Sequence, residues 1–208
     1  MYKPLTILLL TAGSVWAQYK MEPAGPPPSE LAPEITALMQ KEGTRVLAAN
    51  GKAVCELWFR SSLPSGPKSA EEGQTFATLP HGAIIGAIRF PEKGSDRRGQ
   101  SLAAGVYTLR YSLHPMNGDH LGVSPQRDFA VLVPAAEDKV ANSTPSFDDL
   151  MPMSRKASGA AHPAILSITS SSAEKFPAFA KEGDHDWVLH VKIGESPIAV
   201  TVVGKAEG

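Results

Sequence analysis

Apolar and polar residues alternate with a period of two along most of the chain after residue 44. Such alternation is typical of strands that bury one face. It predicts strands over 45–49, 52–60, 75–90, 106–114, 129–133, 164–169, 187–193 and 198–203. Turn-forming residues separate these strands, and strand–helix–strand alternation is absent from the pattern. We therefore expect a mainly β protein, an antiparallel β-sandwich of about eight strands with a short N-terminal helix, a barrel being the alternative.

The segment 106–114 shows how the two faces of a strand are assigned. Its odd-numbered residues, Tyr107 to Leu113, are large and apolar, whereas its even-numbered residues, Thr108 to His114, are polar. The pattern predicts a core-facing side and a solvent-facing side.

Two sequence signals predict how the chain turns. Asn50-Gly51 separates the first two strands and is the dipeptide most typical of a two-residue hairpin with a type I′ turn. Gly82 and Gly86 interrupt the long apolar run 75–90, which indicates a bulge or a bend there.

Helical spacing is confined to two segments. In 29–41 the apolar residues form one stripe, with Ser29 as a cap and Pro33 near the start, where proline is tolerated. The stripe consists of Leu31, Ile35, Leu38 and Met39. A second helix start is predicted at Ser146, and Pro152 is expected to bend or end that helix.

The N-terminus has the organisation of a secretory signal peptide over residues 1–17. A basic start precedes the apolar run 5–10, and Ala17 supplies the small residue before the cleavage site. The run is too short for a membrane anchor, which takes about 20 residues. We expect a periplasmic or secreted protein with a Pro-rich arm over 18–30, one domain over 31–208, and no transmembrane segment after cleavage.

Composition narrows the function classes. Lys plus Arg total 20 and Asp plus Glu total 21, so the basic excess of a nucleic-acid-binding protein is lacking. The single cysteine excludes a disulfide framework and a Cys-rich zinc site. Alternation places Cys55 with Leu57 and Phe59 on a core face, which predicts a buried, inert thiol.

The connection 114–128 is polar and glycine-rich, and loops held by a rigid sheet often carry binding residues. His114, Met116 and His120 could converge on a metal ion, copper or zinc, because imidazole binds both and a thioether favours copper(I). Additional ligands from the following excursion would be Met151, Met153 and His162.

The same connection supplies the candidate residues for binding a ligand or a partner, namely Asp119, Arg127 and Asp128. A purely structural interpretation is the alternative for both sets. In that interpretation Asn117-Gly118 forms a turn and Arg127 pairs with a nearby aspartate.

Evidence for a hydrolase is weaker. A Gly-x-Ser-x-Gly elbow is absent, and the Ser65-x-x-Lys68 string lies in a predicted loop, where the lysine does not return on a helix face. In Asp184-His185-Asp186, neighbouring strand residues point to opposite faces, so adjacency alone makes no acid–base pair. The sequence identifies no catalytic residue.

Several strings resemble a group of exported bacterial proteins of unknown function. They are AGVYTLRY at 104–111, GDHLG at 118–122, SPQRDF at 124–129, SRKASG at 154–159 and HPA at 162–164. The resemblance extends over residues 75–205, and the AG-x-YTL element is also similar to one in a broader family of exported β-sandwich domains. It implies a periplasmic or secreted β-rich domain and brings no activity, cofactor or catalytic residue.

These observations predict a binding or assembly module of the cell envelope without enzymatic activity. Its contacts would be the arm 18–30 or an exposed edge strand, meeting an envelope protein or a second copy, and not nucleic acid. A periplasmic copper- or zinc-binding protein using 114–128 is the alternative, followed by a hydrolase or carbohydrate-active enzyme.

Overall fold

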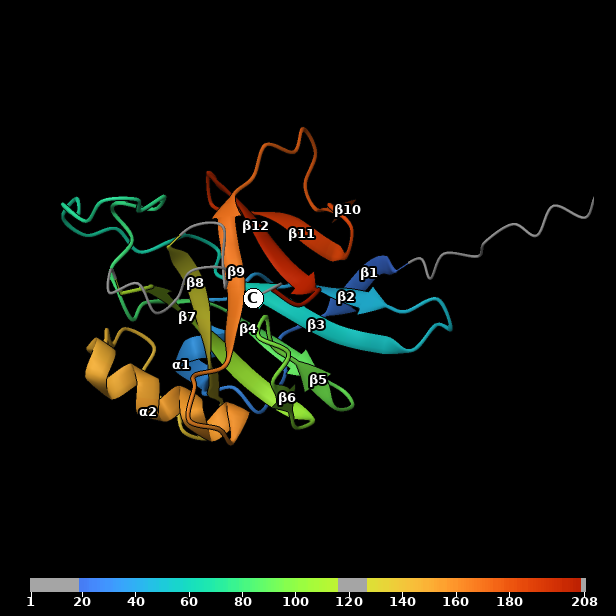
Figure 1. Cartoon of the computed structure of the whole chain (residues 1–208), viewed down its shortest axis with the longest axis horizontal. Coiled ribbons are helices and arrows are strands. Elements are labelled where there is room, and N and C mark those ends of the chain that lie inside the picture. The colour runs from blue at the N-terminus through green and yellow to red at the C-terminus, as the bar shows by residue number, and fades with distance from the viewer. Residues whose placement is uncertain (1–18, 116–126, 207–208) are drawn as a thin grey trace, which may run out of the picture.

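The alternating segments belong to one antiparallel sheet of ten strands in the computed structural model, which describes residues 19–115 and 127–206 (Figure 1). The strand order is β1-β2-β3-β4-β7-β8-β9-β12-β11-β10, and the sheet curls until it is nearly closed into a barrel. The strands are β1 (Lys20–Gly25), β2 (Gly43–Leu47), β3 (Ala53–Phe59), β4 (Ile84–Phe90), β7 (Gly105–Leu113), β8 (Asp128–Pro134), β9 (Ile165–Ser170), β10 (Ala178–Glu182), β11 (Asp186–Ile193) and β12 (Ser196–Val203). A small ribbon pairs β5 (Gly94–Ser95) with β6 (Ser101–Leu102).

The prediction of a mainly β, antiparallel protein is confirmed. The structure has a nearly closed sheet of ten strands in place of the predicted sandwich of about eight. The alternation did not reveal β1 and β10, which are the first and last strands across the sheet. Both are largely exposed edge strands. They therefore do not need the buried apolar face from which the other strands were predicted. The predicted run 75–90 is shortened to β4.

The barrel interior is filled by side chains that alternate along the strands. Cys55, Leu57 and Phe59 lie together in this core, as predicted. Burial, and to a lesser degree the charge of the neighbouring Glu56, raise the pKa of the Cys55 thiol to about 12. The thiol is therefore neutral at physiological pH and behaves as a small apolar side chain.

The outer face of β7 is buried, so the predicted solvent-facing side is wrong. Thr108 and Arg110 are 0% exposed and His114 is 7% exposed. Arg110 donates two 2.7 Å hydrogen bonds to Asp138 and others to the carbonyls of Gly82 and Ser143. The segment after β8 thus folds back over the outer face and supplies the acceptors that a buried guanidinium requires.

Helix α2 (Phe147–Ser158) covers the outer face of β8. Ser146 caps it by accepting a hydrogen bond from the Asp149 N–H, and Gly159 ends it in the left-handed conformation with φ 62°. Leu150 and Met151 pack against β8. The predicted start is confirmed, but Pro152 lies within the helix and does not end it.

The N-terminal helix α1 is shorter than the predicted 29–41 segment and covers only Pro33–Thr36. Ser29 is not the cap, because its hydroxyl donates to Glu30 and the helix begins after Ala32. Beyond α1 the chain bonds to the sheet instead of continuing as a helix: Met39 bridges Arg60 and the Gln40 N–H donates to the Phe59 carbonyl.

The hairpin between β2 and β3 forms where Asn50-Gly51 predicted it, but the turn is not type I′. That turn needs positive φ at both central residues, and in the described chain positive φ occurs at glycine alone. The Gly51 N–H donates to the Ala48 carbonyl, and the Ala48 N–H donates to the Lys52 carbonyl. The loop is therefore three residues long, with Gly51 at φ 78°.

The part of the chain that the structure describes contains no helix long and apolar enough to cross a membrane. The predicted signal peptide, residues 1–17, lies outside the described residues.

Candidate functional site

A groove of about 570 Å³ marks the place where the curled sheet does not close. We call it the seam groove, because it lies between β1–β3 on one side and the β10–β11 region on the other. Its lining is Met21, Glu22, Pro23, Gln40, Lys41, Glu42, Gly43, Thr44, Leu57, Phe59, Phe176, Pro177, Val191 and Lys192. The walls are mostly apolar, and acidic and basic side chains both stand at the rim.

An aromatic cluster closes one end of the seam. The Tyr19 ring, just before β1, meets the Trp187 ring of β11 edge-on at 5.4 Å, and Phe179 of β10 packs on Trp187 at 5.3 Å between centroids. These contacts hold the first strand against the last two, since each aromatic pair adds about 0.5–1.5 kcal/mol beyond its buried area.

The Gln40 side chain spans the seam at the groove. Its Nε2 donates to the Lys192 carbonyl at 2.9 Å and to the Arg60 carbonyl at 3.2 Å. One amide thus ties the segment after β3 to β11.

The backbone edges at the seam come from β1 and β10, which stand at the two ends of the strand order. Each pairs with a strand on one side only within the described sheet. Such an edge presents backbone donors and acceptors that can accept a further strand. Pro23 removes one donor from β1, whereas β10 contains no proline.

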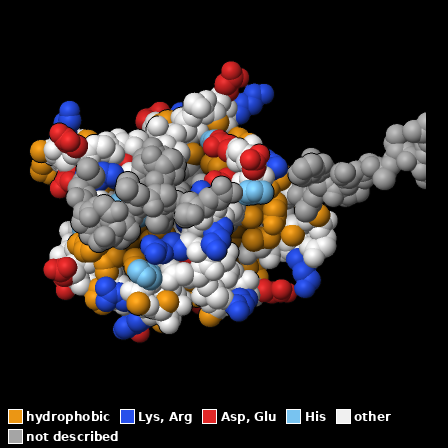
Figure 2. Space-filling view, viewed as in Figure 1, with side chains coloured by type: hydrophobic (Ala, Val, Ile, Leu, Met, Phe, Trp, Pro, Cys, Tyr) orange, Lys and Arg blue, Asp and Glu red, His pale blue; other side chains and the backbone are white. Residues whose placement is uncertain are grey.

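Charged side chains do not form a patch of one sign on the viewed face of the protein. Figure 2 shows both signs interspersed on the face viewed and hydrophobic side chains exposed close to where the grey N-terminal trace begins. A strongly charged ligand is therefore not indicated for this face.

Of the predicted metal and binding residues, the structure describes His114, Arg127 and Asp128, while Met116, Asp119 and His120 lie outside the described residues. His114 is buried and stacks on Phe129, with 4.3 Å between ring centroids. The Arg127 Nε and Nη2 donate to the His114 carbonyl at 3.0 and 2.9 Å. The two ends of the connection are thus brought together.

Asp128 is fully buried and acts as a structural acceptor. It receives hydrogen bonds from the Tyr111 hydroxyl at 2.7 Å and from the N–H groups of Thr75 and Phe76. Burial, and then this carboxylate, raise the pKa of Tyr111, so the phenol stays protonated.

The metal hypothesis stays a prediction. Between 19–115 and 127–206, no group of three or more His, Cys, Asp or Glu side chains could hold a metal ion. Met151 packs beneath α2 against β8 and is not available as a ligand. His162 is exposed on the surface.

The two strings considered for a hydrolase lie in a loop and at the turn that leads into β11. Ser65 and Lys68 lie in irregular loop structure. In the Asp184–Asp186 string, the Asp186 carboxylate is held by an ion pair with Arg97.

The seam groove was missed by sequence reasoning because its walls come from strands and loops far apart in the chain, which only the curl of the sheet brings together. The signal that was present is the aromatic content of 176–187, where two phenylalanines and a tryptophan flank a polar run. No protein-family model, curated protein or solved structure matches this chain.

Proposed function

We propose that this protein is an exported module of the cell envelope that binds an extended segment of a partner polypeptide in the seam groove. The observation that carries the proposal is the groove itself: residues of the edge strand β1 line one wall, and Phe176 and Pro177, which directly precede the edge strand β10, line the other. An added strand pairs its backbone with such an edge and places alternate side chains into flanking pockets.

The lining of the groove supports a peptide over a small polar ligand. Met21, Phe176 and Val191 offer apolar contacts, and Lys41 and Glu42 offer charges of both signs. Because the edge strand β10 is five residues long, the segment that fits would be about five residues of extended chain, roughly 17 Å.

The two edges differ in how well they accept a strand. Pro23 leaves one position of β1 without a donor, so continuous pairing is favoured along β10 from Ala178 onward. We propose that the peptide pairs with β10 and that Pro23 prevents a second copy from adding itself through β1, which is how edge strands commonly avoid aggregation.

Export is part of the same proposal and is supported by the signal-peptide organisation of residues 1–17. The resemblance to exported β-rich proteins agrees with it. In this proposal the mature chain begins at Gln18 and meets its partner in the periplasm or outside the cell.

The test uses the mature chain and a phage-displayed library of random heptapeptides. Selected peptides are expected to slow hydrogen exchange of the amides in 178–182, because strand addition protects the amides of the edge strand that it pairs with. Replacing Phe176 by alanine should weaken binding by about tenfold or more, which is typical of a buried aromatic anchor.

Phe147→Ala is the matched control, since Phe147 is 38% exposed on α2 and lies outside the groove. It should leave the affinity unchanged. The proposal is wrong if selected peptides protect other strands, if both variants bind equally, or if the library yields no binder.

A further inference from the structure

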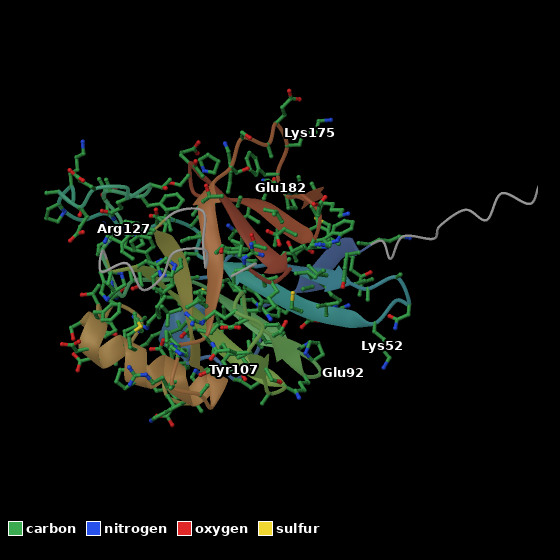
Figure 3. All side chains as sticks on the ribbon, viewed as in Figure 1. Lys52, Glu92, Tyr107, Arg127, Lys175 and Glu182 are labelled. Carbon is green, nitrogen blue, oxygen red and sulfur yellow. The ribbon has the colours of Figure 1, made fainter. Side chains whose placement is uncertain are left out.

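Three polar side chains meet on the outer face of the sheet beside the seam. Ser171 follows β9, His190 lies in β11, and Glu182 ends β10. The Ser171 Oγ lies 2.9 Å from the His190 Nδ1, and the His190 Nε2 lies 3.1 Å from a Glu182 carboxylate oxygen. Figure 3 shows Glu182 below the loop that carries Lys175, which connects Ser171 to β10.

The register of the sheet fixes the neighbours of His190 on the two adjacent strands. His190 stands opposite Ala178 on one neighbouring strand and Ala199 on the other. Paired residues of adjacent strands share a face, and both neighbours here are small. The imidazole is 7% exposed and reaches both Ser171, just after β9, and Glu182, which stands opposite Asp186 at the far end of β10.

Hydrogen-bonding capacity decides the direction of each bond. An ionised carboxylate accepts hydrogen bonds and does not donate them, so Glu182 selects the neutral imidazole tautomer that carries its proton on Nε2. The Nδ1 lone pair then accepts the Ser171 hydroxyl proton. This is the relation of nucleophile, base and orienting carboxylate that activates a serine.

We propose that Ser171 is a nucleophile activated by His190, that Glu182 positions His190, and that the site reacts with small activated acyl esters. Ser171 Oγ forms a bond to the acyl carbon while its proton passes to His190 Nδ1. The ester C–O bond then breaks, and the leaving alcohol takes that proton. Water, deprotonated by the same nitrogen, cleaves the acyl-serine to release the acid and restore Ser171.

The backbone N–H groups around Ser171 determine how reactive its hydroxyl is expected to be. Its N–H donates to the Pro197 carbonyl at 3.1 Å and therefore does not serve the oxyanion of the substrate. The Ala173 N–H donates to Ser171 Oγ at 3.1 Å, which stabilises charge that develops on this oxygen. We expect covalent reaction with activated esters and fluorophosphonates, and slow turnover.

Solvent, and with it a small substrate, can reach the site because Ser171 and Glu182 are both exposed in part. Ser171 is partly exposed, and the Glu182 side chain is 53% exposed. Phe176 and Lys192, which line the seam groove, come from the same loop as Ser171 and the same strand as His190. A small acyl group can therefore reach Ser171 from solvent at the edge of the groove.

The experiment treats the mature chain with a fluorophosphonate probe and locates the label by peptide mass spectrometry. Labelling is expected at Ser171 alone within the Ser170–Ser172 run. Ser172→Ala, the matched control, should retain the label and Ser171→Ala should lose it. His190→Ala should slow labelling by about 100-fold, in line with loss of a general base.

The positioning role of Glu182 is tested with variants whose labelling rate and Tm are both measured. Glu182→Gln should slow labelling by about tenfold without a corresponding change in Tm, and Glu182→Asp should recover part of the rate. The alternative is a structural tie that fastens the loop. It is established, and the proposal overturned, if the folded protein stays unlabelled while a known serine hydrolase reacts, or if Ser170 and Ser172 label equally.

Discussion

Arg110 places a charge in the fully buried layer between β7 and the segment that follows β8. Asp138 neutralises it with two hydrogen bonds and also accepts one from the Thr108 hydroxyl, so the pair is nearly saturated with partners. A buried ion pair contributes little net stability when intact, but losing one partner leaves an uncompensated charge. The position of the 138–143 segment depends on this pair.

Asp138→Ala should lower the free energy of unfolding by about 3–5 kcal/mol, because Arg110 would remain buried without its counter-ion. Glu92→Ala is the control: its pair with Lys52 lies at the surface, with side chains 71% and 66% exposed (Figure 3). That change should cost less than about 1 kcal/mol. Urea denaturation of both variants measures the difference, and equal costs would show that the buried pair does not hold this layer.

At the scale of elements, the turn that leads into β4 depends on a glycine with two constraints. Gly82 has φ +78°, and a Cβ atom there would lie 2.6 Å from the Pro145 carbonyl oxygen. Its N–H also donates to the Tyr111 carbonyl on β7. The close approach lets the segment before α2 pack directly on the turn.

A comparison of Gly82 with Gly51 separates the cost of the backbone conformation from the cost of the close contact. Gly51 has the same φ of +78° but nothing within 4 Å of an added Cβ. Gly51→Ala should cost about 1–2 kcal/mol for the left-handed backbone. Gly82→Ala should cost about 1–3 kcal/mol more, because the Pro145 backbone must also move. Thermal or urea unfolding of the two variants tests this order, and the reverse order would contradict the packing described.

For the whole molecule, the property that matters is that the sheet almost closes. A closed barrel has no strand edges, whereas this nearly closed sheet keeps two, β1 and β10, at the ends of its strand order. The aromatic contacts of Tyr19 and Phe179 with Trp187 and the Gln40 amide fasten the seam at separate points. The edges are therefore held near each other without being paired.

Tyr19→Ala should loosen this closure. Amides of 20–25 are expected to exchange about five- to tenfold faster, since one aromatic pair contributes about 1 kcal/mol to local stability. The exchange of β7 and β8, in the middle of the sheet, should not change. Hydrogen exchange read by mass spectrometry checks both expectations, and uniform acceleration along the chain would mean that the contact supports the whole fold instead of the seam.

Much of the fold was predictable from the sequence, because a strand with a buried face needs alternation whatever its neighbours are. This holds for β3 and β7, whose core residues were assigned correctly, and for the capped start of α2 at Ser146. Cys55 was correctly predicted to be a buried thiol for the same reason.

The features that were not predicted depend on contacts between segments that are distant in the chain. A polar row such as Thr108 to His114 indicates solvent unless an acceptor such as Asp138 folds back over it. The edge strands are short and largely exposed, so only the pairing of β1 with β2 and of β10 with β11 reveals them.

The sequence alone determined the class of fold, the position of most strands and the core residues, since local periodicity records which side chains must leave water. The tertiary structure decided the curl of the sheet, the seam groove and the meeting of Ser171, His190 and Glu182. These depend on strand order and register, which join residues far apart in the chain and leave no local pattern.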